Sequence, residues 1–161
     1  MKNHRSRESA GEPTHATHTS RTMMFSELEL LLNACSRDSG PKDYQTAIID
    51  DNVLGKKTMS TRQHSFRSLR ELYGLSRDIK SFRSMIDLWD ADVESRQVLA
   101  VLCASTRDHT LKETANLIVH LPVGGTATAE MLSQSVESGF PGLYKDSTLA
   151  KIGRNTASTW S

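Results

Sequence analysis

The sequence has few cysteines and lacks a long apolar run. Cys35 and Cys103 are its only two cysteines, and no CxxC pair is present. We therefore expect buried, inert thiols in a reducing compartment rather than disulfides or thiolate metal ligands. Apolar stretches such as residues 30–32 and 117–123 are short or interrupted, well below the roughly 18–20 residues that a membrane helix needs. The sequence thus predicts a cytoplasmic protein without a membrane partner.

Catalytic motifs are also missing. No serine lies in a GxSxG or SxxK pattern, and the Gly-Gly-Thr at residues 124–126 lacks the lysine of a P-loop. Four clustered acids could offer ligands to Mg²⁺, but they surround Asp92, where negative charge stabilises a helix N-terminus. We therefore expect helix capping there and predict that the chain is not an enzyme. These acids are Asp87, Asp90, Asp92 and Glu94.

The histidines do not form a metal-binding pattern. Of the six histidines, His15 and His18 are three residues apart without a third ligand nearby, and the others stand alone. Zinc sites need three or four nitrogen, sulfur or carboxylate ligands in a compatible spacing. The sequence predicts neither a bound metal nor another cofactor.

The first 22 residues differ in composition from the rest of the chain. They contain almost no large apolar side chain and are rich in Ser, Thr, His and Arg. Such a segment cannot bury enough apolar surface to offset the entropy cost of ordering it. We predict that residues 1–22 are a disordered tail and that residues 23–161 form a single domain, a size that can bury roughly 70% of its unfolded surface.

From residue 23 onward, apolar residues recur with the period of an α-helix, and no window alternates as a strand would. Pro41 suits the first turn of a helix, Gly74 suits a helix end, and Thr110 opens a capping box. Residues 98–104 are apolar almost all round, which predicts a helix in the middle of a bundle. The predicted fold class is all-α, a compact bundle of seven to eight helices. The other expected N-caps are Ser60 or Thr61, Asp92 and Thr126.

Basic residues are concentrated in one segment, although the whole chain has a net charge of only +1. Residues 56–83 contain eight Lys or Arg and two acids, a local charge of +6. This favours a surface that contacts a polyanion, while a solvated helix face is the alternative explanation. The candidate phosphate-contacting residues are Lys56, Lys57, Arg62, Arg67, Arg70, Arg77, Lys80 and Arg83.

Within this segment, residues 56–62 combine two lysines, three hydroxyls and Arg62. We expect them to lie at a helix N-terminus, where backbone N–H groups and the helix dipole favour anions. The stretch is therefore a candidate phosphate clamp.

Short motifs along residues 24–160 resemble, in their order, the BrxA family of bacterial BREX phage-exclusion systems. The clearest is TLAKIGRNTASTW at residues 148–160. The others are DNVLGK at 51–56, STR at 60–62, LYGL at 72–75, FR at 82–83, LW at 88–89, SR at 95–96 and ASTRD at 104–108. The resemblance implies a small, non-catalytic, all-helical protein with a NusB-like body and an affinity for nucleic acid. It would work in a multi-protein system that methylates host DNA and blocks phage replication.

Residues 146–161 are consistent with two structures, the first half of a helix-turn-helix or a final bundle helix. In either case we expect Leu149 and Ile152 to face inward. Members of the BrxA family continue past the position matched by Trp160, so a helix-turn-helix here would lack its second half. The outward-facing candidates for nucleic-acid contact are Lys151, Arg154 and Asn155.

Two functions are consistent with these features. The first is a nucleic-acid-binding accessory protein of a BREX-type system, with double-stranded DNA favoured over RNA. The second is a protein-interaction adaptor that binds other BREX proteins. Basic side chains spread over opposite faces would favour the adaptor, since no continuous track for nucleic acid would exist. A compact basic patch beside an apolar patch of roughly 400 Å² would also favour a protein partner.

Overall fold

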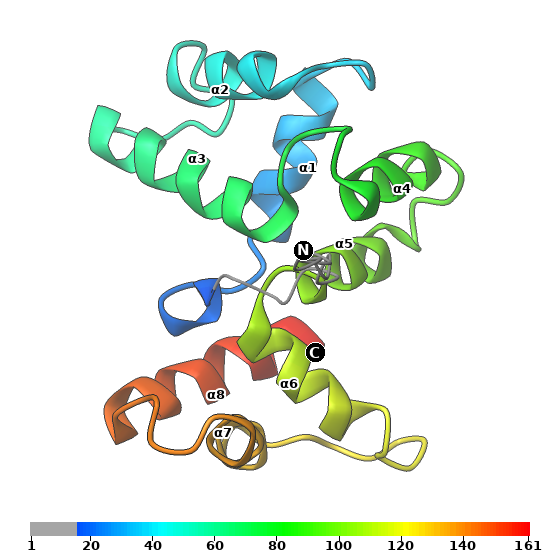
Figure 1. The fold of residues 1–161 in the computed structure, drawn as a ribbon. Helices are drawn as coiled ribbons and strands as arrows, with labels where there is room; N and C mark the ends of the chain where they lie inside the picture. The colour runs from blue at the N-terminus through cyan, green and yellow to red at the C-terminus, as the bar shows by residue number, and fades with distance from the viewer. Residues whose placement is uncertain (1–15) are drawn as a thin grey trace, which may run out of the picture.

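The computed structural model describes residues 16–161, and within them the chain forms α-helices, one short 3₁₀-helix and no strand (Figure 1). None of these helices has the length and apolar character needed to cross a bilayer. The predicted all-α class is confirmed. The elements are η1 (Thr17–Thr19), α1 (Phe25–Ala34), α2 (Pro41–Ile49), α3 (Met59–Tyr73), α4 (Lys80–Leu88), α5 (Arg96–Ser105), α6 (His109–Ile118), α7 (Ala129–Gly139) and α8 (Asp146–Trp160).

The helices form two groups, one above the other in Figure 1. Helices α1 to α5 make up the upper group, and α6 to α8 make up the lower one. The short η1 lies between them and packs against both α3 and α8. The end of α8 reaches α5, because residues of both helices line one hollow of the surface.

The main core lies within the upper group. Its largest fully buried side chains are aromatic, and the rings of Tyr44 and Phe82 meet edge to face with centroids 5.7 Å apart. Buried Leu28, Leu31 and Leu69 pack around them. Aromatic side chains contribute large buried areas, so this cluster is the main source of stability in the upper group.

A smaller apolar contact joins α7 to α8. Leu132 and Val136 of α7 and Ile152 of α8 are fully buried. Gly153 lets the two helices approach closely, since a Cβ atom at this position would lie 2.2 Å from the carbonyl oxygen of Ala129. Helix α8 is therefore one continuous helix whose inner face is packed against α7, α6 and η1.

Two predicted helix boundaries are confirmed. Pro41 is the first residue of α2, where its missing N–H has no intrahelical partner to lose. Gly74 ends α3 with a φ of 85°, a left-handed conformation that glycine adopts without strain.

The predicted N-caps are wrong by two or three residues, because several residues able to cap a helix follow one another in each case. At Thr58, Asp108 and Thr128 the backbone is extended and the side-chain oxygen accepts a bond from the first turn. Ser95 instead has helical backbone angles and makes no such bond. Thr58 caps α3 in place of Ser60 or Thr61, Ser95 precedes α5 in place of Asp92, Asp108 caps α6 in place of Thr110, and Thr128 caps α7 in place of Thr126.

The predicted disordered tail extends too far. Residues 16–22 are described by the structure, and Thr17 and His18 are only 4% and 0% exposed. Their polar contacts anchor the segment despite its lack of large apolar side chains. The remainder of the predicted tail, residues 1–15, lies outside the described residues.

Helix α5 does not lie in the middle of the bundle, contrary to the prediction from its composition. Ala100, Cys103 and Ala104 are buried, whereas Val98 is 60% exposed and Leu102 is 59% exposed. A helix that is apolar all round favours burial of every face. The sequence does not indicate whether the same chain or another protein covers each face.

Candidate interaction surface

Three of the eight predicted phosphate-contacting residues are half-buried and engaged within the chain, and a fourth, the exposed Arg83, donates to the carbonyl oxygen of Arg77 at 3.4 Å. Lys56 forms an ion pair with Glu27, with Nζ and Oε1 3.1 Å apart. Arg62 donates to the carbonyl oxygen of Ile49 at 3.0 Å. Arg77 forms an ion pair with Asp87 at 2.6 Å and also donates to a backbone carbonyl. These side chains hold loops and helices together and are poorly placed to contact a ligand.

This arrangement removes most of the predicted phosphate clamp at the start of α3. Two of its three cations, Lys56 and Arg62, have the partners just described. Thr58 and Thr61 also satisfy each other's backbone N–H groups in a capping box. Lys57 is the one exposed cation that remains in residues 56–62.

The other basic residues of the segment are exposed but lie on different helices. Arg67 and Arg70 are on α3, and the Arg70 guanidinium lies 5.5 Å from the centroid of the Phe66 ring. Lys80 and Arg83 are on α4. Figure 1 shows α3 and α4 on either side of α1. The exposed basic side chains are therefore divided between two helices.

The predicted second patch on α8 is also smaller than expected. Lys151 and Arg154 are exposed. Asn155 is half-buried instead of outward-facing, because its side-chain amide donates to the carbonyl oxygen of His18 at 2.9 Å. Its contact is with the N-terminal segment, and no sequence pattern predicts that this segment lies beside α8.

Exposed apolar side chains lie beside two hollows formed by α4, α5 and the end of α8. We call this region the interaction surface. Its central residues, Val98 and Leu102, project from the outer side of α5, and Leu88 of α4 is 52% exposed beside them. Contiguous exposed apolar side chains are typical of sites where another protein binds. The interaction surface consists of the exposed Leu88, Val98 and Leu102 together with Leu99, Val101 and Trp160, which line the hollows beside them.

Two hollows flank the ridge made by α5. One, of about 260 Å³, lies between α4 and α5 and is lined by Met85, Leu88 and Leu99. The other, of about 320 Å³, lies between α5 and the end of α8 and is lined by Glu94, Val101 and Trp160, among others. Leu102 lines both hollows, so they are neighbours on either side of one side chain.

Acidic residues adjoin this surface where α4 ends and α5 begins. Asp90 bonds Arg37 through both carboxylate oxygens at 2.8 Å, and the hydrogen bond from Arg37 lowers the pKa of Asp90. Asp92 accepts hydrogen bonds from the Glu94 backbone N–H and the Ser95 hydroxyl. Within residues 16–161, neither Asp92 nor Glu94 has an ion-pair partner.

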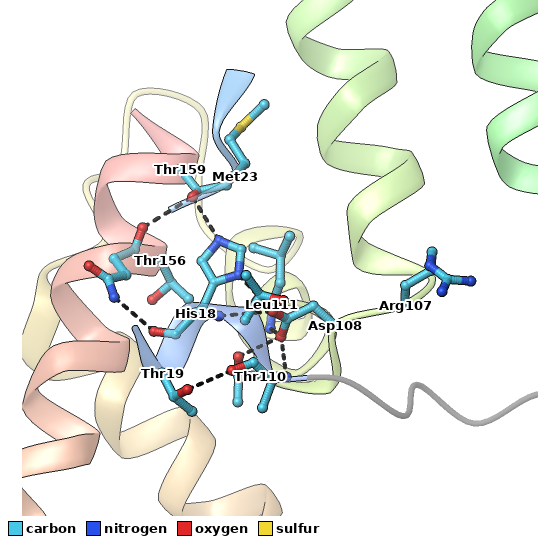
Figure 2. Close-up of polar contacts among 12 residues, drawn as sticks. His18, Thr19, Met23, Arg107, Asp108, Thr110, Leu111, Thr156 and Thr159 are labelled. Carbon is cyan, nitrogen blue, oxygen red and sulfur yellow. Dashed lines mark hydrogen bonds and ion pairs between the residues drawn. The ribbon is translucent and has the colours of Figure 1, made fainter. Parts of the chain in front are cut away.

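A buried polar cluster lies between the two groups of helices, centred on His18 (Figure 2). The His18 Nδ1 atom is 2.8 Å from Oδ2 of Asp108, and its Nε2 atom is 2.9 Å from Oγ1 of Thr159. Asp108 also accepts bonds from Thr110 and Leu111 at the start of α6. No local sequence pattern predicts this cluster, since Asp108 and Thr159 are 90 and 141 residues from His18 in the chain.

The cluster has the carboxylate–imidazole–hydroxyl order of a hydrolase triad, but its surroundings are structural. Its hydroxyl group belongs to Thr159, which is 3% exposed and donates to the carbonyl oxygen of Asn155. A catalytic nucleophile must reach a substrate beside an oxyanion hole, and this hydroxyl faces the protein interior. We assign His18 and Asp108 the role of joining η1, α6 and α8.

The two cysteines have environments that disfavour the reactive thiolate. Burial raises the pKa of Cys103 to about 11, and burial and nearby acids also raise the pKa of Cys35. Both are free thiols. Among the described residues, no group of three or more His, Cys, Asp or Glu could hold a metal ion.

Comparisons with known proteins found no matching family model, no similar curated protein and no similar solved structure. The resemblance to the BrxA family and the NusB-like body therefore stay predictions from short sequence motifs.

Proposed function

We propose that this chain is a non-catalytic protein-interaction adaptor that binds a partner protein through the interaction surface. The observation that supports this most strongly is the exposure of Val98 and Leu102 beside two hollows. Burying two such side chains would contribute roughly 1.5–3 kcal/mol each to association, before the entropy cost of binding. Trp160 beside them is of a residue type enriched at energetically dominant interface positions.

The placement of the basic residues also favours an adaptor. The cations of the 56–83 segment are divided among α3, α4 and the loops before each of them, and Lys56, Arg62 and Arg77 are bound to groups of the same chain. A continuous track for a nucleic-acid backbone needs neighbouring unpaired cations. The resemblance to the BrxA family adds a setting for the adaptor, a bacterial phage-defence complex whose other proteins would be its partners.

Affinity purification from host cells tests the proposal. Tagged wild-type chain, Leu102→Glu and the control Leu143→Glu are expressed beside untagged chain, and co-purifying proteins are quantified by mass spectrometry. Leu143 is a matched control because it is 61% exposed and lies in the loop between α7 and α8. We expect a protein, either the chain itself or another, that the wild type and control retain and that Leu102→Glu loses at least tenfold. Identical protein sets from all three variants would contradict the proposal.

Nucleic-acid binding is the second candidate, because Lys57, Arg67 and Arg70 are exposed and have no carboxylate partner within residues 16–161. Three phosphate contacts predict that affinity for a labelled DNA duplex falls about 40-fold between 50 and 200 mM salt. Fluorescence anisotropy would measure this for the wild type and for a triple alanine variant of these residues. A Lys42→Ala, Lys112→Ala variant controls for the loss of positive charge elsewhere. Equal affinity in the triple variant and the control would exclude α3 as the contact surface.

A further inference from the structure

The interaction surface has opposite charge at its two ends. Helices α4 and α5 are antiparallel, since Ser81 at the start of α4 bonds Thr106 beyond the end of α5 at 3.1 Å, while Leu88 and Leu99 line the same hollow at the other end. Helix α4 has nine residues, so the two ends are about 12 Å apart.

The end near Ser81 and Thr106 is basic. Lys80 and Arg83 are exposed there, and neither has a carboxylate partner within residues 16–161. The exposed Asp78 lies nearby, but its single negative charge does not cancel the two positive charges of Lys80 and Arg83. The opposite end is acidic, because Asp92 and Glu94 are unpaired while Asp87 and Asp90 are neutralised by arginines.

The surface also carries exposed apolar side chains that a second copy would cover. Val98 and Leu102 form a ridge, and the hollow between α4 and α5 lies directly beside it. A two-fold axis in the plane of the surface and perpendicular to α5 would pack Val98 and Leu102 of each copy against the same two residues of the other copy, in antiparallel order. The same rotation would bring the acidic end of one copy against the basic end of the other.

We propose that the interaction surface pairs two copies of this chain as an antiparallel, two-fold symmetric dimer. This inference rests on the proposed function and names the partner of that same site. Each favourable contact occurs twice, with Glu94 of one copy near Lys80 of its partner. The outer side of α3, with Arg67 and Arg70, is not used in the pairing.

Sedimentation equilibrium of the purified full chain tests the pairing. At low salt and protein concentrations from about 5 to about 500 µM, which bracket a weak interface, we expect the wild type to pass from monomer to dimer. Leu102→Glu should raise the dissociation constant at least tenfold, and the control Leu143→Glu should leave it unchanged. Circular dichroism confirms that both variants remain folded.

A charge-reversal cycle tests the antiparallel arrangement. Glu94→Lys and Lys80→Glu should each weaken the dimer several-fold, since each places like charges together twice. The double variant Glu94→Lys, Lys80→Glu should recover most of the loss, because the two ends are again opposite in charge. Additive weakening in the double variant would overturn the antiparallel arrangement.

The outcomes separate this inference from the proposed function. A wild type that stays monomeric throughout, together with a different protein that Leu102→Glu fails to retain from cells, would overturn the self-pairing and leave the adaptor function intact. A monomeric wild type with no such protein would overturn both.

Discussion

His18 and Asp108 form a hydrogen-bonded pair that is completely closed to solvent. Nδ1 and Oδ2 are 2.8 Å apart, and both side chains are 0% exposed. The carboxylate of Asp108 also caps α6, and it accepts the His18 backbone N–H at 3.0 Å. One buried acid thus anchors the N-terminal segment to the helix that begins the lower group (Figure 2).

Replacing His18 should destabilise the fold. His18→Ala removes the imidazole that bonds both the buried Asp108 carboxylate and the Thr159 hydroxyl, at a cost of about 2–4 kcal/mol in the free energy of unfolding. Urea denaturation followed by circular dichroism measures the change. The control His64→Ala removes an exposed histidine of α3 and should alter stability by less than about 0.5 kcal/mol. Equal effects would show that the buried pair is not important for stability.

The same pair predicts an acid-sensitive stability. Burial alone would raise the pKa of Asp108, but the hydrogen bond and charge of His18, with bonds from Thr110 and Leu111, lower it to about 2 from an ordinary value of 3.8. Because the pKa is lower in the folded state, this stabilisation is present above pH 3.8 and is lost as pH falls toward 2. It amounts to about 2 kcal/mol.

Urea unfolding at a series of pH values would detect this loss. The wild type should lose stability more steeply between pH 4 and 2 than Asp108→Asn, whose side chain does not titrate. Parallel pH profiles for the two proteins would contradict the assigned role of Asp108.

Gly153 should tolerate no side chain. In Gly153→Ala the new Cβ would lie 2.2 Å from the Ala129 carbonyl oxygen, so α7 and α8 would have to separate. We expect a loss of about 1–3 kcal/mol in the free energy of unfolding, the usual cost of overpacking. Thermal unfolding measures the melting temperature of this variant and of the control Ser158→Ala, which changes an exposed residue of the same helix. Equal melting temperatures would contradict the close α7–α8 contact.

The two cysteines should differ in accessibility to reagents. Cys35 is half-buried, whereas Cys103 is 3% exposed and its pKa is raised to about 11. Iodoacetamide reacts with exposed thiolate, so native protein should be labelled at Cys35 well before Cys103. Peptide mass spectrometry over time would show the order. Faster labelling of Cys103 would mean that α5 opens readily.

Helix content was predictable from the sequence because the apolar period is long and consistent. Proline and glycine have narrow conformational roles, so Pro41 and Gly74 marked helix ends correctly. Threonine, serine and aspartate cap helices almost equally well, so adjacent candidates such as Asp108 and Thr110 could not be separated.

The role of particular residues was less predictable. His18 lies in a segment with almost no large apolar side chain, and its partners are distant in the chain, so no local pattern indicated its burial. Val98 and Leu102 looked like core residues because composition does not distinguish a core from an interface. Arg62 and Arg77 have the sequence signature of free surface charges. In the structure Arg62 donates to a backbone carbonyl and Arg77 pairs with a carboxylate, and no local pattern predicts either contact.

Site-specific photo-crosslinking in cells tests the central claim most directly. Benzoylphenylalanine replaces Leu102 in one strain and the equally exposed Leu143 in another, and the irradiated chain is analysed by mass. The account predicts a discrete covalent adduct from position 102, with the mass of two chains if the copies pair, and no such adduct from position 143. Absence of an adduct at position 102, or the same diffuse products from both positions, would contradict a protein partner at the interaction surface.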